Sequence, residues 1–380
     1  MDTITLIATL SFGLEAVVKR ELQALGFENL QAANGKVEFD ARPDQIPTVN
    51  LWLRAADRVL LKMGAFQAVT FDELFEQTRG LAWEDWITRD GQFTVTGKSI
   101  KSQLGSVRAC QAIVKKAVVE RLKEKYQTEW FAETGPEYTI QVSLLRDEAQ
   151  LTIDTSGSGL HKRGYRIQAG EAAIKETLAS ALVQLSFWNK DRLLVDPLCG
   201  SGTILIEAAL QGRNIAPGLK RKFAAERWPQ VPQRAWDLAR NAAYEAIDRS
   251  GELQIFGSDL DASLIPACRA NAQRASVGDD IVFEHKDVHE LWIDQQYGIL
   301  ISNPPYGIKL SEFQEINQIY ITLHKMFRKK TGWSIYILTA DKKFPDYFKR
   351  ARPDRVRKLY NGNIEVQYYQ YFGERPPQEL

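Results

Sequence analysis

The opening of the chain alternates apolar, β-branched stretches with segments whose apolar residues recur at helical spacing. Residues 3–10 form such a stretch and predict a strand, and helically spaced apolar residues follow from Leu14 to Leu25, before Gly26. A further short strand is predicted at 37–39. This pattern predicts a small α+β unit over about the first 60 residues.

A second α+β stretch is predicted from residue 65 to residue 155, with strands at 93–96, 138–142 and 150–154. Between the first two of these strands, a helix that begins at Val107 carries an apolar face formed by Cys110, Ile113, Val114, Ala117, Val118 and Leu122. The turn-rich run from Asp154 to Gly159 predicts a domain boundary.

The remainder of the chain alternates predicted strands and helices. A helix is expected over about Glu171 to Phe187, and strands follow at 193–196, 255–259, 281–284, 298–301 and 333–338, with amphipathic helices between most of them. Such alternation predicts a doubly wound, mostly parallel sheet. We expect three domains, at 1–65, 66–156 and 157–380.

Composition excludes several classes of protein. A chain of 380 residues with 44% hydrophobic and 26% charged residues is typical of a globular protein. It has no apolar run near the roughly 20 residues that cross a bilayer, and Glu15 interrupts the N-terminal segment before a signal peptide could form. The cysteines are few and lack CxxC spacing, so neither a disulfide framework nor a metal site is predicted, and we expect a cytoplasmic protein.

The net charge of +1 is uninformative, but basic residues cluster locally. From Lys98 to Lys125 the chain carries eight lysines and arginines, and only Glu120 and Glu124 oppose them. A second basic run extends from Lys342 to Lys358. A basic helix face suits RNA phosphates, although an ordinary solvated helix surface has the same composition.

A glycine loop is the first candidate for chemistry. The run Val195 to Thr203 follows a predicted strand and opens a helix, and Gly200 and Gly202 allow the backbone to approach a ligand closely. No Gly-Lys-Ser/Thr follows, which excludes a P-loop, and Asp196 suits an amino-acid ammonium better than a pyrophosphate. A plain strand-to-helix turn is the alternative interpretation.

Further acidic residues end the next two predicted strands. Asp259 can accept both hydroxyls of a ribose, whereas Asp261 is better suited to cap the following helix. Asp287 can accept from an adenine amino group, with the Val288 amide reaching the ring. Three acids at the ends of three strands, behind a glycine loop, favour a nucleoside site over isolated loop acids.

The run Asn303-Pro304-Pro305-Tyr306 is the most specific motif in the chain. An exocyclic amine of a base is a poor nucleophile, because its lone pair is delocalised into the ring. The Asn303 side-chain oxygen and the Pro304 carbonyl can accept both N–H groups and turn the lone pair towards a methyl donor. Tyr306 can stack on the base. A Pro-Pro turn after a strand is the structural alternative.

Together these motifs resemble the class I methyltransferases that act on amino groups. Further segments narrow the resemblance: Gly13 to Leu22, Ser102 to Leu122, Lys162 to Arg166, Ile215 to Gly218 with Phe223 to Pro229, and Lys358 to Ile364. With these segments the whole chain is similar to the THUMP-domain methyltransferases related to the rRNA large-subunit methyltransferase L, which modifies guanine N2 in 23S rRNA.

The resemblance implies a ferredoxin-like domain, a THUMP RNA-binding domain and a Rossmann-like, seven-stranded methyltransferase domain, with S-adenosyl-L-methionine as cofactor. It implies that Asn303, Pro304, Pro305 and Tyr306 hold the base. The cofactor residues that it implies are Asp196, Pro197, Cys199, Gly200, Ser201, Gly202, Thr203, Asp259, Leu260, Asp287, Val288 and Asn303. The residues expected to face RNA are Lys101, Arg108, Lys115, Lys116, Arg163 and Arg166.

Two features depart from the family pattern. Only one catalytic domain is predicted, whereas some relatives fuse a second methyltransferase. Alanine also stands in the run Ala172 to Glu176 where relatives commonly have proline, which weakens the transfer of details at that helix start.

The catalytic motif alone does not identify the acceptor, because adenine N6, cytosine N4, guanine N2 and a protein glutamine amide are all planar amines. We expect guanine N2 in 23S rRNA or a large-subunit precursor, in a region of folded RNA where the base can be flipped out. A DNA adenine-N6 methyltransferase is an alternative, but the sequence contains no separate target-recognition region. A non-catalytic RNA-binding assembly factor is the other alternative, against which the intact Asp196, Asp259, Asp287 and Asn303 argue.

Overall fold

The computed structural model describes residues 3–166, 174–306, 312–350 and 352–376. These residues divide into two compact units. The first unit takes in 3–9, 19–160 and 222–242, and the second takes in the other described residues.

The first unit is built on one seven-stranded sheet with the order β2-β3-β1-β4-β7-β6-β5. Of its neighbouring strands, β5 and β6 pair in parallel. The strands are β1 (Ile4–Leu10), β2 (Gln31–Ala33), β3 (Lys36–Ala41), β4 (Ala56–Gln67), β5 (Gln92–Ile100), β6 (Glu137–Leu145) and β7 (Glu148–Asp154). The long strand β4 was not predicted, and it crosses residue 65, so the two predicted N-terminal domains share one continuous sheet. Their exact boundary stays a prediction.

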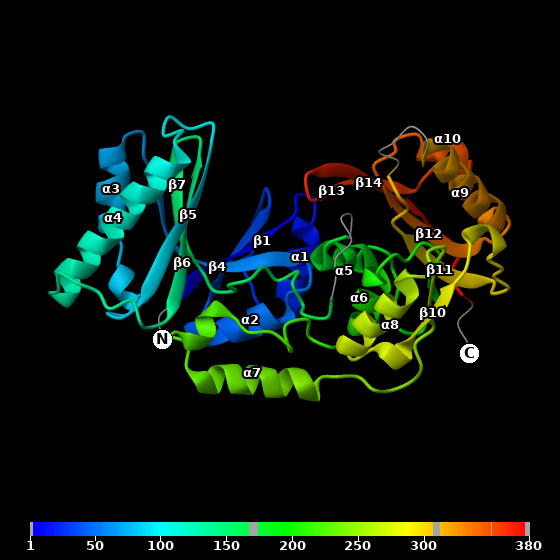
Figure 1. Cartoon of the computed structure of the whole chain (residues 1–380), viewed down its shortest axis with the longest axis horizontal. Coiled ribbons are helices and arrows are strands. Elements are labelled where there is room, and N and C mark those ends of the chain that lie inside the picture. Colours follow the sequence, from blue (N-terminus) through cyan, green and yellow to red (C-terminus); the bar gives the residue numbers. More distant parts are fainter. Residues whose placement is uncertain (1–2, 167–173, 307–311, 351, 377–380) are drawn as a thin grey trace. The chain divides into compact units, whose positions relative to one another are not determined.

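The helices that lie mostly within the first unit are α1 (Glu15–Ala24), α2 (Ile46–Trp52), α3 (Phe71–Arg79), α4 (Val107–Tyr126) and α7 (Gln233–Glu245). The Ser106 side chain caps α4 by accepting a hydrogen bond from the Ala109 amide, and α4 begins at Val107 as predicted. The predicted apolar face of α4 is buried except for Ile113, which is half-buried. Helices α3 and α4 pack side by side, with α4 on β5 and β6 (Figure 1).

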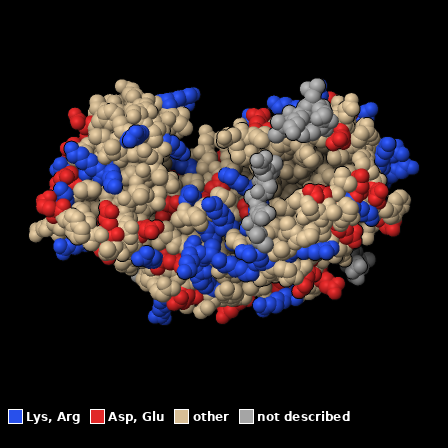
Figure 2. Space-filling view, in the orientation of Figure 1, with Lys and Arg blue, Asp and Glu red and all other residues tan. Residues whose placement is uncertain are grey.

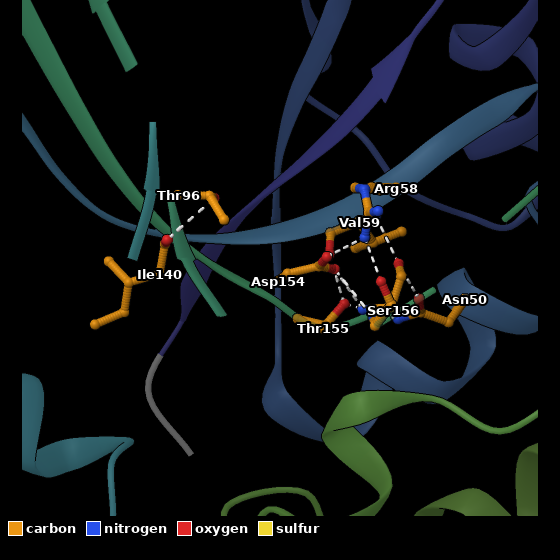
Figure 3. Close-up of polar contacts among 9 residues, drawn as sticks. Asn50, Arg58, Val59, Thr96, Ile140, Asp154, Thr155 and Ser156 are labelled. Atoms are coloured by element: carbon orange, nitrogen blue, oxygen red, sulfur yellow. Dashed lines mark hydrogen bonds and ion pairs between the residues drawn. The ribbon is translucent and has the colours of Figure 1, made fainter. Parts of the chain in front are cut away.

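The run from Asp154 to Gly159, where a domain boundary was predicted, is largely buried. Thr155 and Ser156 are fully buried, and Asn50 of α2 donates to Thr155 Oγ1 over 2.9 Å and accepts from Ser156 Oγ over 2.7 Å. Asp154 forms an ion pair with Arg58 of β4 (Figure 3). These polar side chains hydrogen-bond to one another instead of to water, and they tie the end of β7 to β4 and α2.

The second unit contains the predicted doubly wound sheet, with seven strands in the order β10-β9-β8-β11-β12-β14-β13. The first five strands in this order pair in parallel, and β14 and β13 are antiparallel additions that were not predicted. The strands are β8 (Leu194–Asp196), β9 (Ile255–Asp259), β10 (Ile281–His285), β11 (Tyr297–Ser302), β12 (Gly332–Thr339), β13 (Arg355–Asn361) and β14 (Ile364–Tyr371).

Helices cover both faces of this sheet. They are α5 (Glu176–Gln184), α6 (Thr203–Gly212), α8 (Leu264–Arg274), α9 (Glu312–Phe327) and α10 (Phe344–Phe348). The first three lie on one side and α9 and α10 on the other (Figure 1). The helix before β8 was predicted from Glu171 to Phe187, but α5 runs only from Glu176 to Gln184, and Lys175 before it is extended. Glu171 and Ala172 lie outside the described residues.

The connections place β8 between β9 and β11, so the chain continues on opposite sides of β8. In an open parallel sheet, such a switch point leaves a crevice at the carboxyl ends of the strands. The core beneath it is apolar, with Val195, Leu300, Tyr320 and Trp333 packed together. Within the described residues, no helix is both long and apolar enough to cross a membrane.

Candidate active site

All four predicted motifs meet at the carboxyl edge of the parallel strands. Asp196, Asp259 and Ser302 are the last residues of β8, β9 and β11, and Asp287 follows β10 by two residues. The register pairs Asp196 with Gly257 and Val195 with Leu300, which keeps these strand ends level. The parallel sheet therefore gathers residues that are up to about a hundred positions apart in sequence.

The glycine loop has a conformation that only glycine adopts without strain at two positions. Gly202 has φ +76°, and a Cβ there would lie 2.9 Å from the Phe283 ring. Gly200 has φ +53°, but a Cβ there would meet no atom within 4 Å. The backbone at Gly200 therefore faces open space, which a bound molecule can approach closely.

Residues of β9 and α8 hold this loop in place. The Gly200 amide donates to Asp259 Oδ2 over 2.8 Å, and the Cys268 thiol donates to the Gly200 carbonyl over 2.9 Å. Asn271, one helical turn further along α8, donates to the Ser201 carbonyl over 3.4 Å. Cys268 and Asn271 were not predicted from the sequence, because nothing near them in sequence relates them to the loop.

The loop cysteine, Cys199, is buried and free, as is Cys268. A hydrogen bond with Cys268, together with burial, raises the pKa of the Cys199 thiol above its ordinary value. The thiol therefore stays protonated and unreactive at neutral pH. Pro197 is likewise buried, and the Ser201 and Thr203 hydroxyls lie 3.0 Å apart at the start of α6.

Asp196 is the most perturbed carboxyl group of the site. It is only 2% exposed, and burial raises its pKa to about 7, although hydrogen bonds from Ser302 and Leu198 act in the opposite direction. Ser302 Oγ donates over 2.7 Å and the Leu198 amide over 3.1 Å. Within the described part of the chain, no cation pairs with this carboxyl group. A buried carboxyl group without a cationic partner fits the ammonium of an amino-acid ligand.

The acidic residues at the ends of β9 and β10 lie at the carboxyl edge of the sheet, and their carboxylates accept hydrogen bonds from backbone amides of nearby turns. Asp259 accepts from the amides of Gly200 and Asp261, and the exposed Leu260 follows it. Asp261 accepts from the Ser263 amide over 2.9 Å, but the N-cap of α8 is Ser263, so the prediction that Asp261 caps this helix is wrong. Asp287 Oδ1 accepts from the His289 amide over 2.8 Å.

The catalytic motif follows β11 directly. Asn303 and Tyr306 are half-buried, Pro304 is buried and Pro305 is exposed. The Tyr306 hydroxyl donates to Asn303 Oδ1 over 2.8 Å, and Asn361 Nδ2 donates to the same hydroxyl over 3.3 Å. Ser302 joins this motif to Asp196, and it was not singled out from the sequence although it directly precedes Asn303.

Two arginines that we predicted to face RNA are turned inward. Arg163 is 4% exposed, and its guanidinium pairs with the fully buried Glu207 of α6 at 3.4 Å. Arg166 donates to Thr203 Oγ1 over 2.7 Å. The prediction that Arg163 faces RNA is wrong, because a buried charge needs a charged partner and Glu207 supplies it. Arg166 is half-buried, and its guanidinium contacts the start of α6 instead of extending freely from the surface.

The basic residues near the start of α4 are exposed, as predicted: Lys101, Arg108, Lys115 and Lys116. Within the described ranges, none of them forms an ion pair. Lys115 Nζ lies 6.0 Å from the centre of the Phe93 ring of β5, and Lys116 Nζ lies 5.6 Å from that of Phe75 of α3. The two lysines therefore lie on different sides of α4.

The end of α4 is electrostatically different. Arg121 pairs with Glu84 at 2.6 Å, and Lys123 pairs with Glu129 at 3.0 Å. Figure 2 shows acidic side chains interspersed with basic ones over α3 and α4. Only the first half of α4 thus keeps unpaired positive charge.

Three family descriptions match successive parts of the chain. The description "RMKL-like, methyltransferase domain" matches residues 163–370, "RlmL ferredoxin-like domain" matches 5–60, and "THUMP domain" matches 68–154. Among similar proteins, "Putative RNA methyltransferase YpsC" of Bacillus subtilis is 46% identical over 380 residues, which cover 100% of this chain and 98% of that protein. "Ribosomal RNA large subunit methyltransferase K/L" of Psychromonas ingrahamii is 33% identical over 97% of this chain, which spans only 50% of that longer protein.

Solved structures agree over the whole chain. The crystal structure of "SMU.472, a putative methyltransferase complexed with SAH" is 41% identical, with a TM-score of 0.94, and the match covers 99% of this chain and 100% of that one. A structure from Listeria monocytogenes described as "a predicted N6-adenine-specific DNA methylase" is 46% identical, also with a TM-score of 0.94, over 98% and 97% of the two chains.

The loop, the acids and the Asn-Pro-Pro-Tyr motif thus lie in the part of the chain that matches the methyltransferase description, which follows the ferredoxin-like and THUMP domains in the sequence. The cofactor is S-adenosyl-L-methionine, whose demethylated form, SAH, is bound in the similar structure. The chain belongs to the THUMP-containing, RlmL-like family of S-adenosylmethionine-dependent RNA methyltransferases.

Proposed function

We propose that this protein methylates the N2 amino group of a guanine in 23S rRNA or a large-subunit precursor. The observation that supports methyl transfer to an amine at this site is the hydrogen bond of 2.7 Å between Ser302 and Asp196, which joins the strand end before Asn303 to the strand end before the glycine loop. An amine held at Asn303 then lies beside a donor bound at Gly200.

The cofactor pocket follows from the chemistry of the residues at this edge. Asp196 binds the ammonium of S-adenosylmethionine, and the open backbone face at Gly200 accommodates its amino-acid part. The Asp259 carboxylate already accepts hydrogen bonds from two backbone amides, and its remaining lone pairs accept from the ribose hydroxyls. Asp287 and the Val288 amide read the adenine, and the exposed Leu260 packs on it.

The protein's task in the transfer is to hold the amine and to accept its hydrogen bonds. Asn303 Oδ1 and the Pro304 carbonyl accept the two N–H groups, and the ring of Tyr306 stacks on the base. The bound sulfonium supplies an electrophilic methyl group: the nitrogen lone pair forms the new C–N bond, the C–S electron pair passes to sulfur, and the nitrogen releases a proton to solvent. Since that nitrogen becomes acidic, the site needs no strong base.

The acceptor is assigned from the N-terminal domains. A THUMP domain and the exposed, unpaired lysines of α4 suit an RNA backbone, and the similar protein from Psychromonas is named for large-subunit rRNA. The Listeria structure is described as a DNA methylase, and the same Asn-Pro-Pro-Tyr chemistry would serve adenine N6. Product analysis separates these acceptors, because digestion of the methylated nucleic acid releases N2-methylguanosine in one case and the nucleoside of N6-methyladenine in the other.

Asn303→Ala tests the proposal most simply. Removing one acceptor from the amine should lower turnover by roughly 100-fold or more, while the affinity for SAH, measured by calorimetry, changes little. Tritium transfer from S-adenosylmethionine to rRNA purified from a strain lacking this gene measures turnover. Unchanged turnover, or an equal loss of turnover and SAH affinity, would contradict the role given to Asn303.

A further inference from the structure

Among the described residues, Asn361 of the hairpin of β13 and β14 hydrogen-bonds to the catalytic motif. Asn361, the last residue of β13, donates from Nδ2 to the Tyr306 hydroxyl over 3.3 Å, and that hydroxyl donates to Asn303 Oδ1 over 2.8 Å. The segment Lys358 to Ile364 carried part of the family resemblance, but the proposed mechanism assigns it no role.

The orientation of the Asn361 amide sets the direction of the protons in this series of hydrogen bonds, because its Nδ2 faces the Tyr306 hydroxyl. An amide NH2 group can only donate, so the phenol oxygen accepts from Asn361 and its single proton is left for Asn303. Burial raises the pKa of Tyr306, so the phenol keeps its proton at neutral pH. The Tyr306 hydroxyl therefore needs an acceptor. This requirement favours the orientation of the Asn303 amide in which Oδ1, and not Nδ2, faces the hydroxyl.

The fold holds Asn361 in this position by three devices. Gly362 has φ +60° at the first position of a two-residue turn, as a type II′ hairpin requires, and it fixes the pairing of Asn361 with Ile364. Leu359, two residues before Asn361 and therefore on the same face of β13, is fully buried. A Cβ at Gly13 would lie 2.8 Å from the Lys358 carbonyl, so that loop packs directly on the β13 backbone.

We propose that Asn361 is a positioning residue for methyl transfer, which acts through Tyr306 to keep the Asn303 amide in its accepting orientation. The proposal rests on the proposed function and extends it. An amide oxygen has two lone pairs, so Asn303 Oδ1 can accept from Tyr306 and from the amine of the base together. A flipped amide would set an N–H donor against the N–H of the base, and the amine would not be held.

The variant Asn361→Asp removes the donor but keeps the size of the side chain. With rRNA from a strain lacking this gene and tritiated S-adenosylmethionine, we expect kcat to fall by about 3- to 10-fold, the effect of one lost hydrogen bond. The affinity for SAH should not change. Asn363→Asp, an exposed residue in the same turn with the same change of charge, is the matched control and should retain full activity.

A double-mutant cycle with Tyr306→Phe separates positioning from a general effect on folding. Because the Tyr306→Phe variant has no hydroxyl for the side chain at position 361 to reach, Asn361→Asp should cause no further loss of kcat in that background. The same 3- to 10-fold loss in both backgrounds, or no loss in the wild-type background, would overturn the inference.

The outcome also shows which of the two proposals fails. If Asn303→Ala retains full turnover, the proposed function is wrong and the inference falls with it. If Asn303→Ala is inactive and Asn361→Asp behaves like the wild type, only the role of Asn361 is wrong.

Discussion

Cofactor affinity should depend on pH through one buried carboxyl group. Burial raises the pKa of Asp196 to about 7, and the nearby Asp259 carboxylate adds to this effect. If the ammonium of the cofactor binds the ionised form, the apparent affinity follows the ionised fraction of Asp196. Lowering the pH therefore weakens binding even though the cofactor keeps its own positive charge.

The size of the effect follows from the pKa. With a pKa near 7, roughly 9% of Asp196 is ionised at pH 6 and about 76% at pH 7.5, so the dissociation constant should fall about eightfold between them. The ordinary α-amino pKa of about 7.7–8.0 leaves the ligand ammonium roughly 60–75% protonated at pH 7.5, which reduces the expected fall to about five- to sixfold. Binding at pH 7 should release about half a proton per molecule bound.

Isothermal titration calorimetry with SAH measures both quantities, in two buffers whose ionisation enthalpies differ. Ser302→Ala is the informative companion, because it removes a hydrogen bond that stabilises the carboxylate, and it should shift the affinity profile to higher pH. A dissociation constant that is constant over this range, or the same pH dependence in Asp196→Asn, would refute the reasoning.

The same shift affects stability without cofactor. Since the folded protein holds a proton on Asp196 that the unfolded chain releases, this group lowers the free energy of unfolding as the pH rises from about 4 to about 7. Bound cofactor should offset that loss.

Three further predictions follow from the packing. Arg163→Ala leaves Glu207 without its charged partner and should lower the free energy of unfolding by about 3–5 kcal/mol. In the same denaturant titrations, Lys162→Ala, at an exposed position, should change it by less than about 0.5 kcal/mol. Equal effects would contradict the buried pair. Lys115→Ala should reduce the slope of log K for RNA binding against log salt concentration by up to about 0.9. Lys123 already pairs with Glu129, so Lys123→Ala should leave this slope unchanged. A reversed order would exclude the start of α4 from the RNA surface. Gly202→Ala, with a Cβ 2.9 Å from Phe283, should lose more unfolding free energy than Gly251→Ala, which shares a positive φ but meets no atom within 4 Å, and similar losses would argue against the close approach.

Periodicity in the sequence was sufficient to predict the parallel strands and the helix α4, because buried apolar residues dominate them. It missed β4, whose burial alternates irregularly around a break in register between Lys62 and Gly64, and the edge strand β13, whose first residues are exposed. Such strands are defined by their partners more than by their own composition.

The candidate site was predictable where one motif carries its own chemistry, and not where two distant segments meet. The glycine loop and Asn303 were found from local sequence. Glu207, which lies 44 residues from Arg163, and Ser302, which lies 106 residues from Asp196, were not. A single sequence does not show which distant residue will pair with a charge, so Arg163 was placed on the surface when it is buried.

The most direct test of the central claim is to identify the methylated nucleoside. Ribosomal RNA from a strain lacking this gene is incubated with the protein and S-adenosylmethionine, digested, and analysed by mass spectrometry, with Asn303→Ala in parallel. We expect one additional methyl group on the exocyclic nitrogen of a guanosine in 23S rRNA, formed by the wild-type protein and nearly absent with the variant. Methylation of a ring nitrogen, a carbon or a ribose, or equal product with both proteins, would contradict the account.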